Sequence, residues 1–435
     1  MRKPLACAAV AGLLLALIPA PEARAETAGS GACAVTVTTA ANVVVANSGG
    51  YCYLAFTATG ANAFTVPAGV TSADFLIIAG GGAGGSYAFG GGGGAGEVAV
   101  ATSYALTPSA SISLYVGAGG VSNGSISSST SSVGTNSWVV SNVGIVANGG
   151  GFGTSWSQST VSNGGNGGGG NEQNAGTGGG LSVKSTYGTA TRYGNDGGRI
   201  ATGATQAGSG GGGAGAAGAG VTAFGVPSAG GDGTNAVSSW LSAIRSGMTG
   251  ITGWDSATST GYIAGGGGGG GNNGATLYGV GGVGGGGRGG NASPNGIAGI
   301  ANTGSGGGGG SWNGAGASGG AGGSGLIVVK FAVAPSASSI SIAASASYTY
   351  RTAGTITATL GVSGTDGRVT FYQNGKRIPG CIKILSASLT ASCSWRPTSR
   401  GSIKLSASLT PTSAGYLSST STLIQSSVVT RTSKR

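Results

Sequence analysis

The sequence contains no histidine and few charged side chains. Lys, Arg, Asp and Glu make up only 7% of its 435 residues. Without histidine, general acid–base catalysis would have to rely on carboxylates, Lys, Tyr or Cys, and a zinc site would have to rely on cysteine. Solvated disordered chains are usually rich in charge, whereas this chain has a mean hydropathy of +0.22 and apolar material to bury. The composition therefore excludes histidine-based chemistry and argues against plain disorder.

The few carboxylates are isolated, mostly in glycine-rich loops. Asp196 (GNDGG), Asp232 (GGDGT) and Asp366 (GTDGR) have the sequence context of turns. We therefore expect no catalytic residue, no cofactor and no metal site. Two alternatives stay open: carboxylates that pair in space would allow a hydrolase, and GNDGG and GGDGT could hold calcium.

The sequence contains the glycines of a dinucleotide-binding motif but lacks the helix that should follow them. The stretch FLIIAGGGAGG contains G-x-G-x-x-G at Gly80, Gly82 and Gly85. That fingerprint needs a following helix, whose N-terminal amides hold the pyrophosphate. Here SYAFGGGGGAG follows, and each glycine costs a helix about 1 kcal/mol relative to alanine. We expect no nucleotide site.

No apolar run of 18 residues occurs after the N-terminus. At the N-terminus itself, Arg2 and Lys3 precede an apolar stretch from Leu5 to Ile18, and an A-x-A site follows at 23–25. This pattern predicts a signal peptide over residues 1–25. We expect a secreted, extracellular protein that has no transmembrane segment in its mature chain and associates with the cell surface non-covalently.

Cysteine is also scarce, and the mature chain would keep four: Cys33, Cys52, Cys381 and Cys393. An even number in an exported chain suggests disulfides, and four cysteines allow three connectivities. We favour the local pairs Cys33–Cys52 and Cys381–Cys393, because each pair falls within one short β segment. Free thiols or a four-cysteine metal site are the alternatives.

The positive charge is concentrated near the C-terminus. Residues 331–435 hold eleven Lys or Arg and one acidic residue, whereas residues 26–330 hold six basic and seven acidic ones. A basic exported domain suits surface glycans or anionic cell-envelope polymers, although it can also be a merely solvated surface. The interleaved aromatics of a single-strand nucleic-acid binder are missing, so we expect no nucleic-acid partner.

Glycine is abundant, with 99 residues gathered into tracts between strand-like segments. The segment 325–331 (GLIVVKF) is apolar on both faces except at Lys330, which predicts a buried central strand. The other expected strands lie within 33–66, 73–79, 97–106, 111–116 and 137–147. One helix is expected near 235–247, with a stripe formed by Val237, Trp240, Leu241 and Ile244.

The tryptophans fall into two groups. Trp138 lies in an apolar strand and Trp240 on the helix stripe, so both are expected in the core. Trp156, Trp254 and Trp312 lie in polar loops beside glycine tracts. A tryptophan in such a loop can stack on a sugar ring or anchor an interface, or it can simply cap a tract.

The composition changes after a Pro/Ser/Ala linker at 332–338. Glycine becomes ordinary and strict alternation of apolar and polar residues appears, with Asn374-Gly375 as a hairpin signal. Some seven short strands predict a small β-sandwich over 339–425, followed by a basic tail at 426–435.

Several motifs resemble the glycine-rich domain of phage tail-fibre proteins and exported bacterial proteins. They are FTVPAGVTSADFLIIAGGGAGG, SNVGIVANGGGFG, ITGWDSATSTGYIAGGGGGGG and GGAGGSGLIVVKF. The resemblance implies packed polyglycine II helices on a jelly-roll-like β scaffold, and in some members loops at the helix ends that meet a receptor. GRVTFYQNGKRIPGC, ASCSWRPTSRG and TPTSAGYLSSTST resemble bacterial Ig-like repeats of exported proteins.

The expected fold is thus mainly β: a jelly-roll-like scaffold carrying polyglycine II tracts (26–331) and a C-terminal Ig-like β-sandwich. A lone tract should be disordered, because fixing glycine costs more than its hydrogen bonds return, so the tracts must pack as a bundle. We expect a non-enzymatic structural or adhesive surface protein. The alternatives are a matrix- or ice-interacting structural protein and, more distantly, a hydrolase that uses carboxylates.

Overall fold

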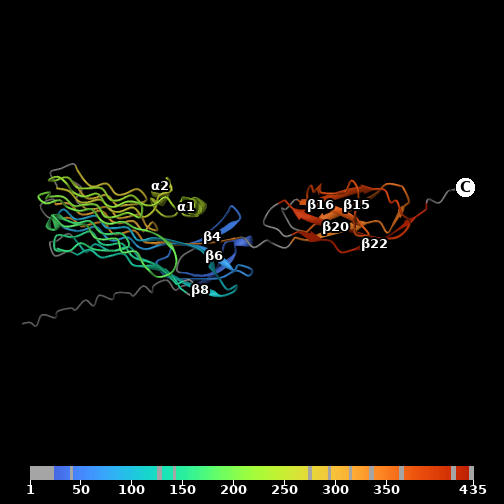
Figure 1. Cartoon of the computed structure of the whole chain (residues 1–435), viewed down its shortest axis with the longest axis horizontal. Helices are drawn as coiled ribbons and strands as arrows, with labels where there is room; N and C mark the ends of the chain where they lie inside the picture. Colours follow the sequence, from blue (N-terminus) through green and yellow to red (C-terminus); the bar gives the residue numbers. More distant parts are fainter. Residues whose placement is uncertain are drawn as a thin grey trace, which may run out of the picture.

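The computed structural model describes residues 24–39, 43–124, 130–140, 144–272, 277–291, 295–312, 316–332, 338–361, 367–412 and 418–430. Most of the expected signal peptide, nearly all of the linker and the end of the basic tail lie outside these residues. Figure 1 shows two bodies, a glycine-rich module and a smaller β-sandwich.

The glycine-rich module begins with two antiparallel six-stranded sheets. The first has the strand order β1-β2-β5-β8-β9-β10. Its strands are Arg24–Ala28 (β1), Val35–Thr39 (β2), Gly60–Thr65 (β5), Ser111–Val116 (β8), Ser137–Val139 (β9) and Ile145–Ala147 (β10). The second has the order β11-β7-β6-β12-β4-β3. Its strands are Thr191–Tyr193 (β11), Val98–Ala105 (β7), Ser72–Ile78 (β6), Leu326–Ala332 (β12), Tyr51–Phe56 (β4) and Val44–Ser48 (β3).

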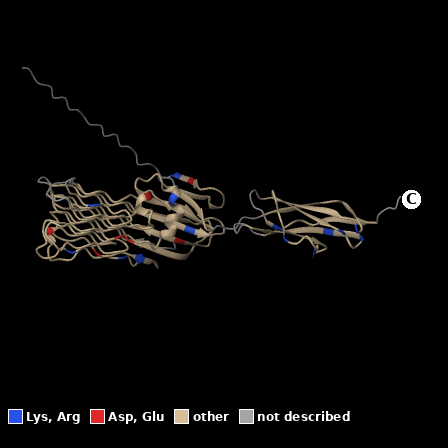
Figure 2. Ribbon diagram, turned by 90° about the horizontal axis from the view of Figure 1, so that it is seen from above, with Lys and Arg blue, Asp and Glu red and all other residues tan. Residues whose placement is uncertain are grey.

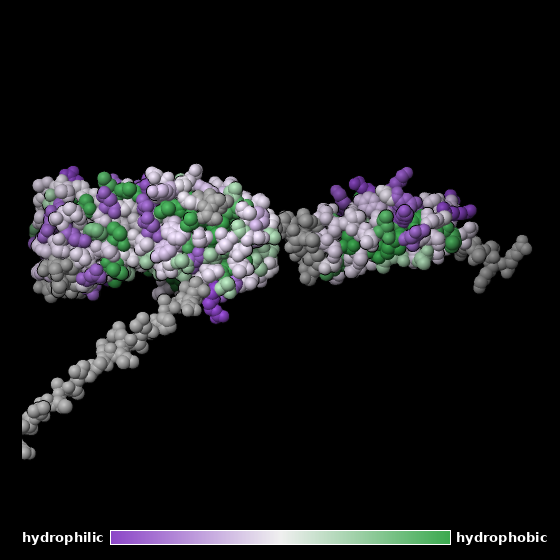
Figure 3. Space-filling model, turned by 90° about the horizontal axis from the view of Figure 1, so that it is seen from below, coloured by the Kyte–Doolittle hydropathy of each residue, from purple (hydrophilic) through white to green (hydrophobic). Residues whose placement is uncertain are grey.

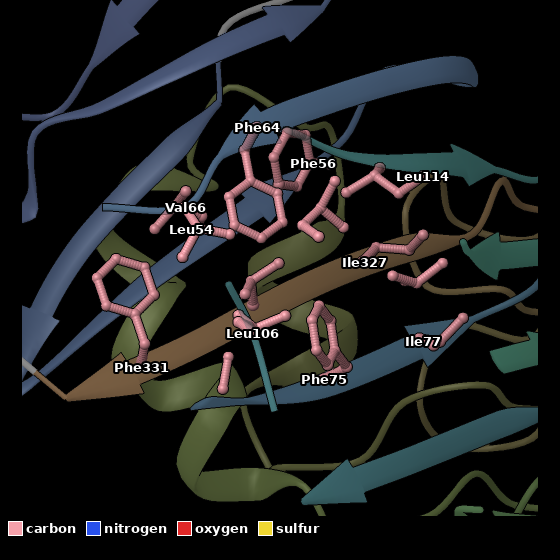
Figure 4. Close-up of a cluster of buried hydrophobic side chains, with 14 of the residues drawn as sticks. Leu54, Phe56, Phe64, Val66, Phe75, Ile77, Leu106, Leu114, Ile327 and Phe331 are labelled. Atoms are coloured by element: carbon pink, nitrogen blue, oxygen red, sulfur yellow. The ribbon is translucent and has the colours of Figure 1, made fainter. Parts of the chain in front are cut away.

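The two sheets share a core of aromatic and aliphatic side chains (Figure 4). Phe64 and Leu114 come from the first sheet, and Phe56, Phe75 and Ile327 from the second; each is at most 1% exposed. Alternation along each strand places these residues on the inner face, which is the arrangement of a β-sandwich. The expected mainly-β fold class is confirmed.

Strand β12 is buried on both faces, as its sequence predicts. Ile327 and Val329 face the core between the sheets, whereas Leu326 and Val328 contact a second cluster beneath two short helices. The helices are α1 (Ser238–Ile244) and α2 (Trp254–Thr258), with 3-10 turns at Gly31–Cys33, Glu172–Asn174 and Arg245–Gly247. Lys330, the one charged residue of β12, forms an ion pair with Asp74 at 3.1 Å.

Helix α1 carries the expected apolar stripe. Val237, Trp240, Leu241 and Ile244 are at most 8% exposed and belong to the cluster under the helices. Trp138 is different: it is half-buried and stacks on Tyr115 with ring centroids 5.4 Å apart. Its neighbours in β9 take the buried positions, so the expectation that Trp138 lies in the core was wrong.

The glycine tracts form neither α-helices nor β-sheets, and their backbones hydrogen-bond to one another. In the tract 265–271, amides three residues apart donate to the same neighbouring segment. Gly266 and Gly269 donate to 228–231, Gly267 and Gly270 to 90–93, and Gly268 and Gly271 to 287–290. The carbonyls of the tract accept from three further segments, 208–211, 279–282 and 306–312. A three-residue period of bond direction is that of an extended threefold helix, which has no internal hydrogen bonds.

Only glycine fits at these positions. A Cβ on Gly267 would lie 2.0 Å from the carbonyl oxygen of Gly307, and one on Gly269 would lie 1.9 Å from that of Gly208. Both obstacles are backbone atoms that are themselves hydrogen-bonded within the bundle. The run of seven glycines is thus required by the close approach of the surrounding segments.

The C-terminal body is a sandwich of two sheets around its own core. One sheet has the order β13-β15-β19, and the other β14-β22-β20-β16-β17, with β18 paired to β16 and β21 to β20. The strands are Ile340–Ala344 (β13), Ser347–Thr349 (β14), Gly354–Leu360 (β15), Gly367–Gln373 (β16), Lys376–Arg377 (β17), Ile384–Leu385 (β18), Thr390–Trp395 (β19), Gly401–Pro411 (β20), Ser419–Thr420 (β21) and Ile424–Val429 (β22). The division of the strands between the two sheets is that of an Ig-like sandwich.

Two features of this sandwich bear on the sequence predictions. Asn374 and Gly375 both have positive φ, 50° and 77°, as a tight hairpin between β16 and β17 requires. The expected boundary between the sandwich and a basic tail at residue 426 was wrong. It falls inside strand β22 (Ile424–Val429), which pairs with β20 and β14. Its alternating burial holds Val428 in the core, so the sandwich extends beyond residue 425.

Both favoured disulfides are present. Cys33 and Cys52 join the 3-10 turn before β2 to strand β4, and Cys381 and Cys393 join a turn to strand β19. All four cysteines are buried and contribute to the cores of their bodies. Because all four cysteines are in disulfides, the alternatives of free thiols and of a four-cysteine metal site are excluded for these residues.

Candidate functional site at the tip of the glycine bundle

The first glycine tract leaves one sheet, turns and returns to the same sheet. The chain leaves β6 at residue 79 and re-enters a strand at 98, and hydrogen bonds from Gly82 to Gly94 and from Gly85 to Gly91 close the two arms. The turn between the arms, at 86–90, therefore lies at the end of the bundle farthest from the sheets. Figure 1 shows the tracts running side by side to this end, at the left of the view. We call this end the distal tip.

Three aromatic rings from distant parts of the sequence meet at the distal tip. Tyr87 contacts Trp156 and Trp312 edge-on, with ring centroids 6.2 Å and 5.2 Å apart. Its backbone pairs with Ala317 in both directions, at 2.6 Å and 3.0 Å. The turn is strained, since Tyr87 and Phe89 have φ of 78° and 50°, values that bulky residues rarely adopt. Such strain persists where the surroundings over-determine a conformation, and it is common at binding sites.

These side chains enclose a partly open hollow of about 220 Å³, lined by Tyr87, Ala88, Phe89, Trp156 and Trp312. We call it the aromatic cup. Trp156, Trp312 and Tyr87 are half-buried, so each ring has one supported and one accessible part. Aromatic walls of this kind take the apolar face of a sugar ring or an aliphatic group.

The cup rests on serine hydroxyls that connect four segments. The Ser155 hydroxyl oxygen accepts from the Ser86 amide at 2.9 Å and lies 3.1 Å from the Ser131 hydroxyl. The Ser86 hydroxyl also contacts that of Ser122 at 2.5 Å. Buried and mutually bonded hydroxyls hold the turns that carry Tyr87 and Trp156 in fixed relation. Sequence patterns gave no sign of this network, because its members are isolated serines in different tracts.

Trp254 is not part of the cup, and it does not lie in an exposed loop as its sequence context suggests. It starts helix α2 and is fully buried in the cluster beneath the helices. Its indole N–H donates to the Asn302 carbonyl at 3.1 Å. The sequence TGWDSATS looks like a polar loop, but the indole is enclosed by chain segments far away in sequence, so the prediction of ligand contact for Trp254 was wrong.

Most carboxylates of the glycine-rich module are engaged in structural contacts. Asp196 and Asp232 accept backbone N–H bonds from Ser182 and Val283, at 2.6 Å and 2.9 Å. Glu97 is fully buried and forms an ion pair with Arg192 at 2.7 Å. Across the described ranges, no three His, Cys, Asp or Glu side chains gather as metal ligands would.

The sandwich has a basic outer sheet face. Alternation along β16 and β20 places Arg368 and Lys404 outward, and Arg377 of β17 pairs with outward-facing Tyr372. Figure 2 shows Lys and Arg in the drawn part of the sandwich and no Asp or Glu there. In Figure 3 the hydrophilic residues of this body gather mainly along one side. We call this surface the basic face.

None of the described helices is long and apolar enough to span a membrane. No curated protein matches the chain significantly. Among solved structures, the CARDB domain of a Pyrococcus furiosus protein, crystallised with two metal ions, is similar at 13% identity and a TM-score of 0.17; the alignment covers 22% of this chain and 94% of that one. The glycine-rich domain family model matches residues 57–332, which is more than half of the chain. The chain therefore belongs to the glycine-rich domain family.

Proposed function

We propose that this protein is a secreted, non-enzymatic structural or adhesive protein of the cell surface. In this proposal the glycine-rich module is a rigid support, and its working part is the aromatic cup at the distal tip. The observation that carries the proposal is the meeting of Tyr87, Trp156 and Trp312, from three separate tract turns, around one open hollow. Aromatic side chains of this kind are enriched where proteins bind partners.

The bundle suits this role because it is stiff. Every residue of the tract 266–271 donates a hydrogen bond to a neighbouring segment, in the three-residue rotation of polyglycine II. We infer that the tracts are polyglycine II helices like those of phage tail fibres. Because each tract is hydrogen-bonded to its neighbours, the turns at the tip keep their positions. A ligand therefore binds a preorganised surface, and little conformational entropy is lost on binding.

Export is supported by the chemistry of the cysteines. Two disulfides persist in oxidising compartments, and the N-terminal residues have the pattern of a signal peptide. Strand β1 begins at Arg24, inside the expected signal peptide, so cleavage after Ala25 would leave the strand from Glu26 onward still able to pair with β2.

The basic face of the sandwich gives the protein a second contact, with anionic envelope polymers such as phosphate- or uronate-rich glycans. Arg368, Arg377 and Lys404 project from one sheet, and no acidic residue accompanies them in the described part of this body. Exposed charges of one sign attract polyanions at low ionic strength and lose that attraction as salt screens them. This contact would hold the protein to the surface while the aromatic cup stays accessible.

The test of the cup uses the full-length protein in pull-downs on envelope material and on glycan arrays. Trp156→Ala combined with Trp312→Ala should abolish binding to the arrayed ligand, whereas Trp395→Phe, in the sandwich, should leave it unchanged. Binding that survives loss of both cup tryptophans would refute the role of the tip.

The test of the basic face measures retention on an anionic polysaccharide resin at low salt. Arg377→Glu with Lys404→Glu should cause early elution, while Arg199→Glu, at an exposed arginine of the glycine-rich module, should change little. Equal retention of the double variant and the unmodified protein would exclude anchoring through this face.

A further inference from the structure

A second, larger hollow lies at the opposite end of the glycine bundle from the aromatic cup. It has a volume of about 630 Å³, within the range of small-molecule sites. Its walls come from five places: Lys184, β11 with the two residues that follow it, the turn 214–216, the segment 232–236 that leads into α1, and Tyr262 after α2. Ala214 belongs to the cluster beneath the helices and Tyr193 packs against it, so the hollow lies at the sheet end of the bundle. We call it the base cleft.

The walls of the base cleft are fixed by backbone hydrogen bonds. Gly215 and Ala216 both donate to the Asp232 carbonyl at 3.0 Å. Thr234 and Ile263 exchange two bonds, at 3.0 Å and 3.1 Å, which ties the segment before α1 to the one after α2. A cleft built from paired segments keeps its shape before a ligand arrives.

The polar groups in the cleft suit hydroxyl groups. Three of the lining residues are Tyr193, Tyr262 and Asn235. The side chains of these residues form no hydrogen bond to another residue that the structure describes. The Tyr193 ring also packs against the cluster beneath the helices, so its orientation is supported. Tyrosine rings and hydroxyls, with an amide that both donates and accepts, are the groups that can recognise a sugar.

The charges of the cleft nearly cancel. Arg192 is committed to the Glu97 carboxylate and to the carbonyls of Val146 and Gly188, so its guanidinium builds the wall. Lys184 and Asp232 are then the charged groups left at the surface of the cleft, one of each sign. A strongly anionic ligand, of the kind proposed for the basic face, gains nothing here.

We propose that the base cleft binds a neutral hexose-containing saccharide. The proposal is independent of the aromatic cup, whose walls are almost purely apolar and whose volume is about a third of that of the base cleft. The protein then carries two ligand sites, one at each end of the same glycine rods.

The test is calorimetric titration of the full-length protein with maltose, cellobiose and lactose. At least one of these disaccharides should bind, and Tyr262→Ala should weaken that binding by about tenfold or more, the effect of removing a ring together with its hydroxyl. Tyr278→Ala is the matched control, because Tyr278 is an exposed tyrosine that contacts Arg288 and does not line the cleft; this variant should bind as the unmodified protein does.

A second variant, Asn235→Ala, is needed in case Tyr262→Ala impairs folding. Asn235 is exposed and its side chain forms no hydrogen bond to another described residue, so its loss should leave the fold unchanged. If Tyr262→Ala lowers the melting temperature, reduced affinity in Asn235→Ala at an unchanged melting temperature supports the cleft. The proposal is overturned if none of the three sugars binds. It is also overturned if the cleft variants bind normally while Trp156→Ala does not, since the sugar then occupies the aromatic cup.

Discussion

Replacing Gly267 by alanine tests whether the glycine tracts are packed structure. Gly267 lies in the middle of the seven-glycine run, and its amide donates to the Gly93 carbonyl at 2.8 Å. An added Cβ would sit 2.0 Å from the Gly307 oxygen, whereas ordinary contact begins near 3.4 Å. One of the two tracts must therefore move by more than an ångström.

The cost can be worked out from the bonds at risk. A shift of that size stretches the bonds from Gly267 to Gly93, from Gly211 to Gly267 and from Gly307 to Gly82, all between 2.8 and 3.0 Å. Each buried group left unpaired costs about 1–3 kcal/mol. Alanine also reduces the conformational entropy of the unfolded chain, which offsets only about 0.4–1 kcal/mol of this loss. With one or two bonds lost, we expect the free energy of unfolding of the module to fall by about 2–5 kcal/mol.

Urea unfolding followed by tryptophan fluorescence measures this loss, because Trp240 and Trp254 are buried beside the sheets that carry the tracts. The control is Gly178→Ala, at an exposed turn where an added Cβ meets nothing within 4 Å. That variant should be neutral or slightly stabilised. A Gly267→Ala protein as stable as Gly178→Ala would refute the reasoning.

Three other changes have defined outcomes. Glu97→Gln should destabilise the module by about 3–5 kcal/mol in urea unfolding, because it leaves Arg192 buried without its 2.7 Å partner. Cys381→Ser with Cys393→Ser removes the bridge across 12 residues and should lower the free energy of unfolding of the sandwich by about 2–4 kcal/mol. Asn302→Ala removes bonds to the carbonyls of Thr57 and Gly325 and should cost about 1–3 kcal/mol, measured by the same unfolding curve.

Each of these has its own control. Asp255→Asn removes an exposed ion pair with Arg245 and should change stability by less than about 1 kcal/mol, so an equal effect of Glu97→Gln would contradict the role of burial. The double serine variant should leave the transition of the glycine-rich module unmoved. If Asn302→Ala leaves the stability unchanged, the carbonyls of Thr57 and Gly325 do not depend on Asn302 and hydrogen-bond to water in the variant.

The sequence predicted the parts of the fold whose signal is local. The apolar run of β12, the stripe of α1, the hairpin at Asn374-Gly375 and the local cysteine pairs each depend on residues close in the chain. The glycine runs were also predictable as packed segments, since a lone tract cannot offset its own ordering cost.

The sequence does not indicate which glycine tracts are neighbours in the bundle, because one glycine run is like another. The contact between Tyr87, Trp156 and Trp312 was therefore not predicted. The same limit explains Trp254, whose indole is held by Asn302, 48 residues away. The base cleft was missed for the same reason, because its walls come from five separated places in the sequence.

The central claim is that the glycine tracts are ordered by hydrogen bonds to one another. Amide hydrogen exchange over residues 264–272 tests it most directly, since Gly266 to Gly271 each donate to a neighbouring segment. The structure predicts that these amides exchange orders of magnitude more slowly than an unstructured glycine peptide, and only through unfolding of the module. Complete exchange within seconds would show that the tract is a linker, and both tip and base sites would lose their support.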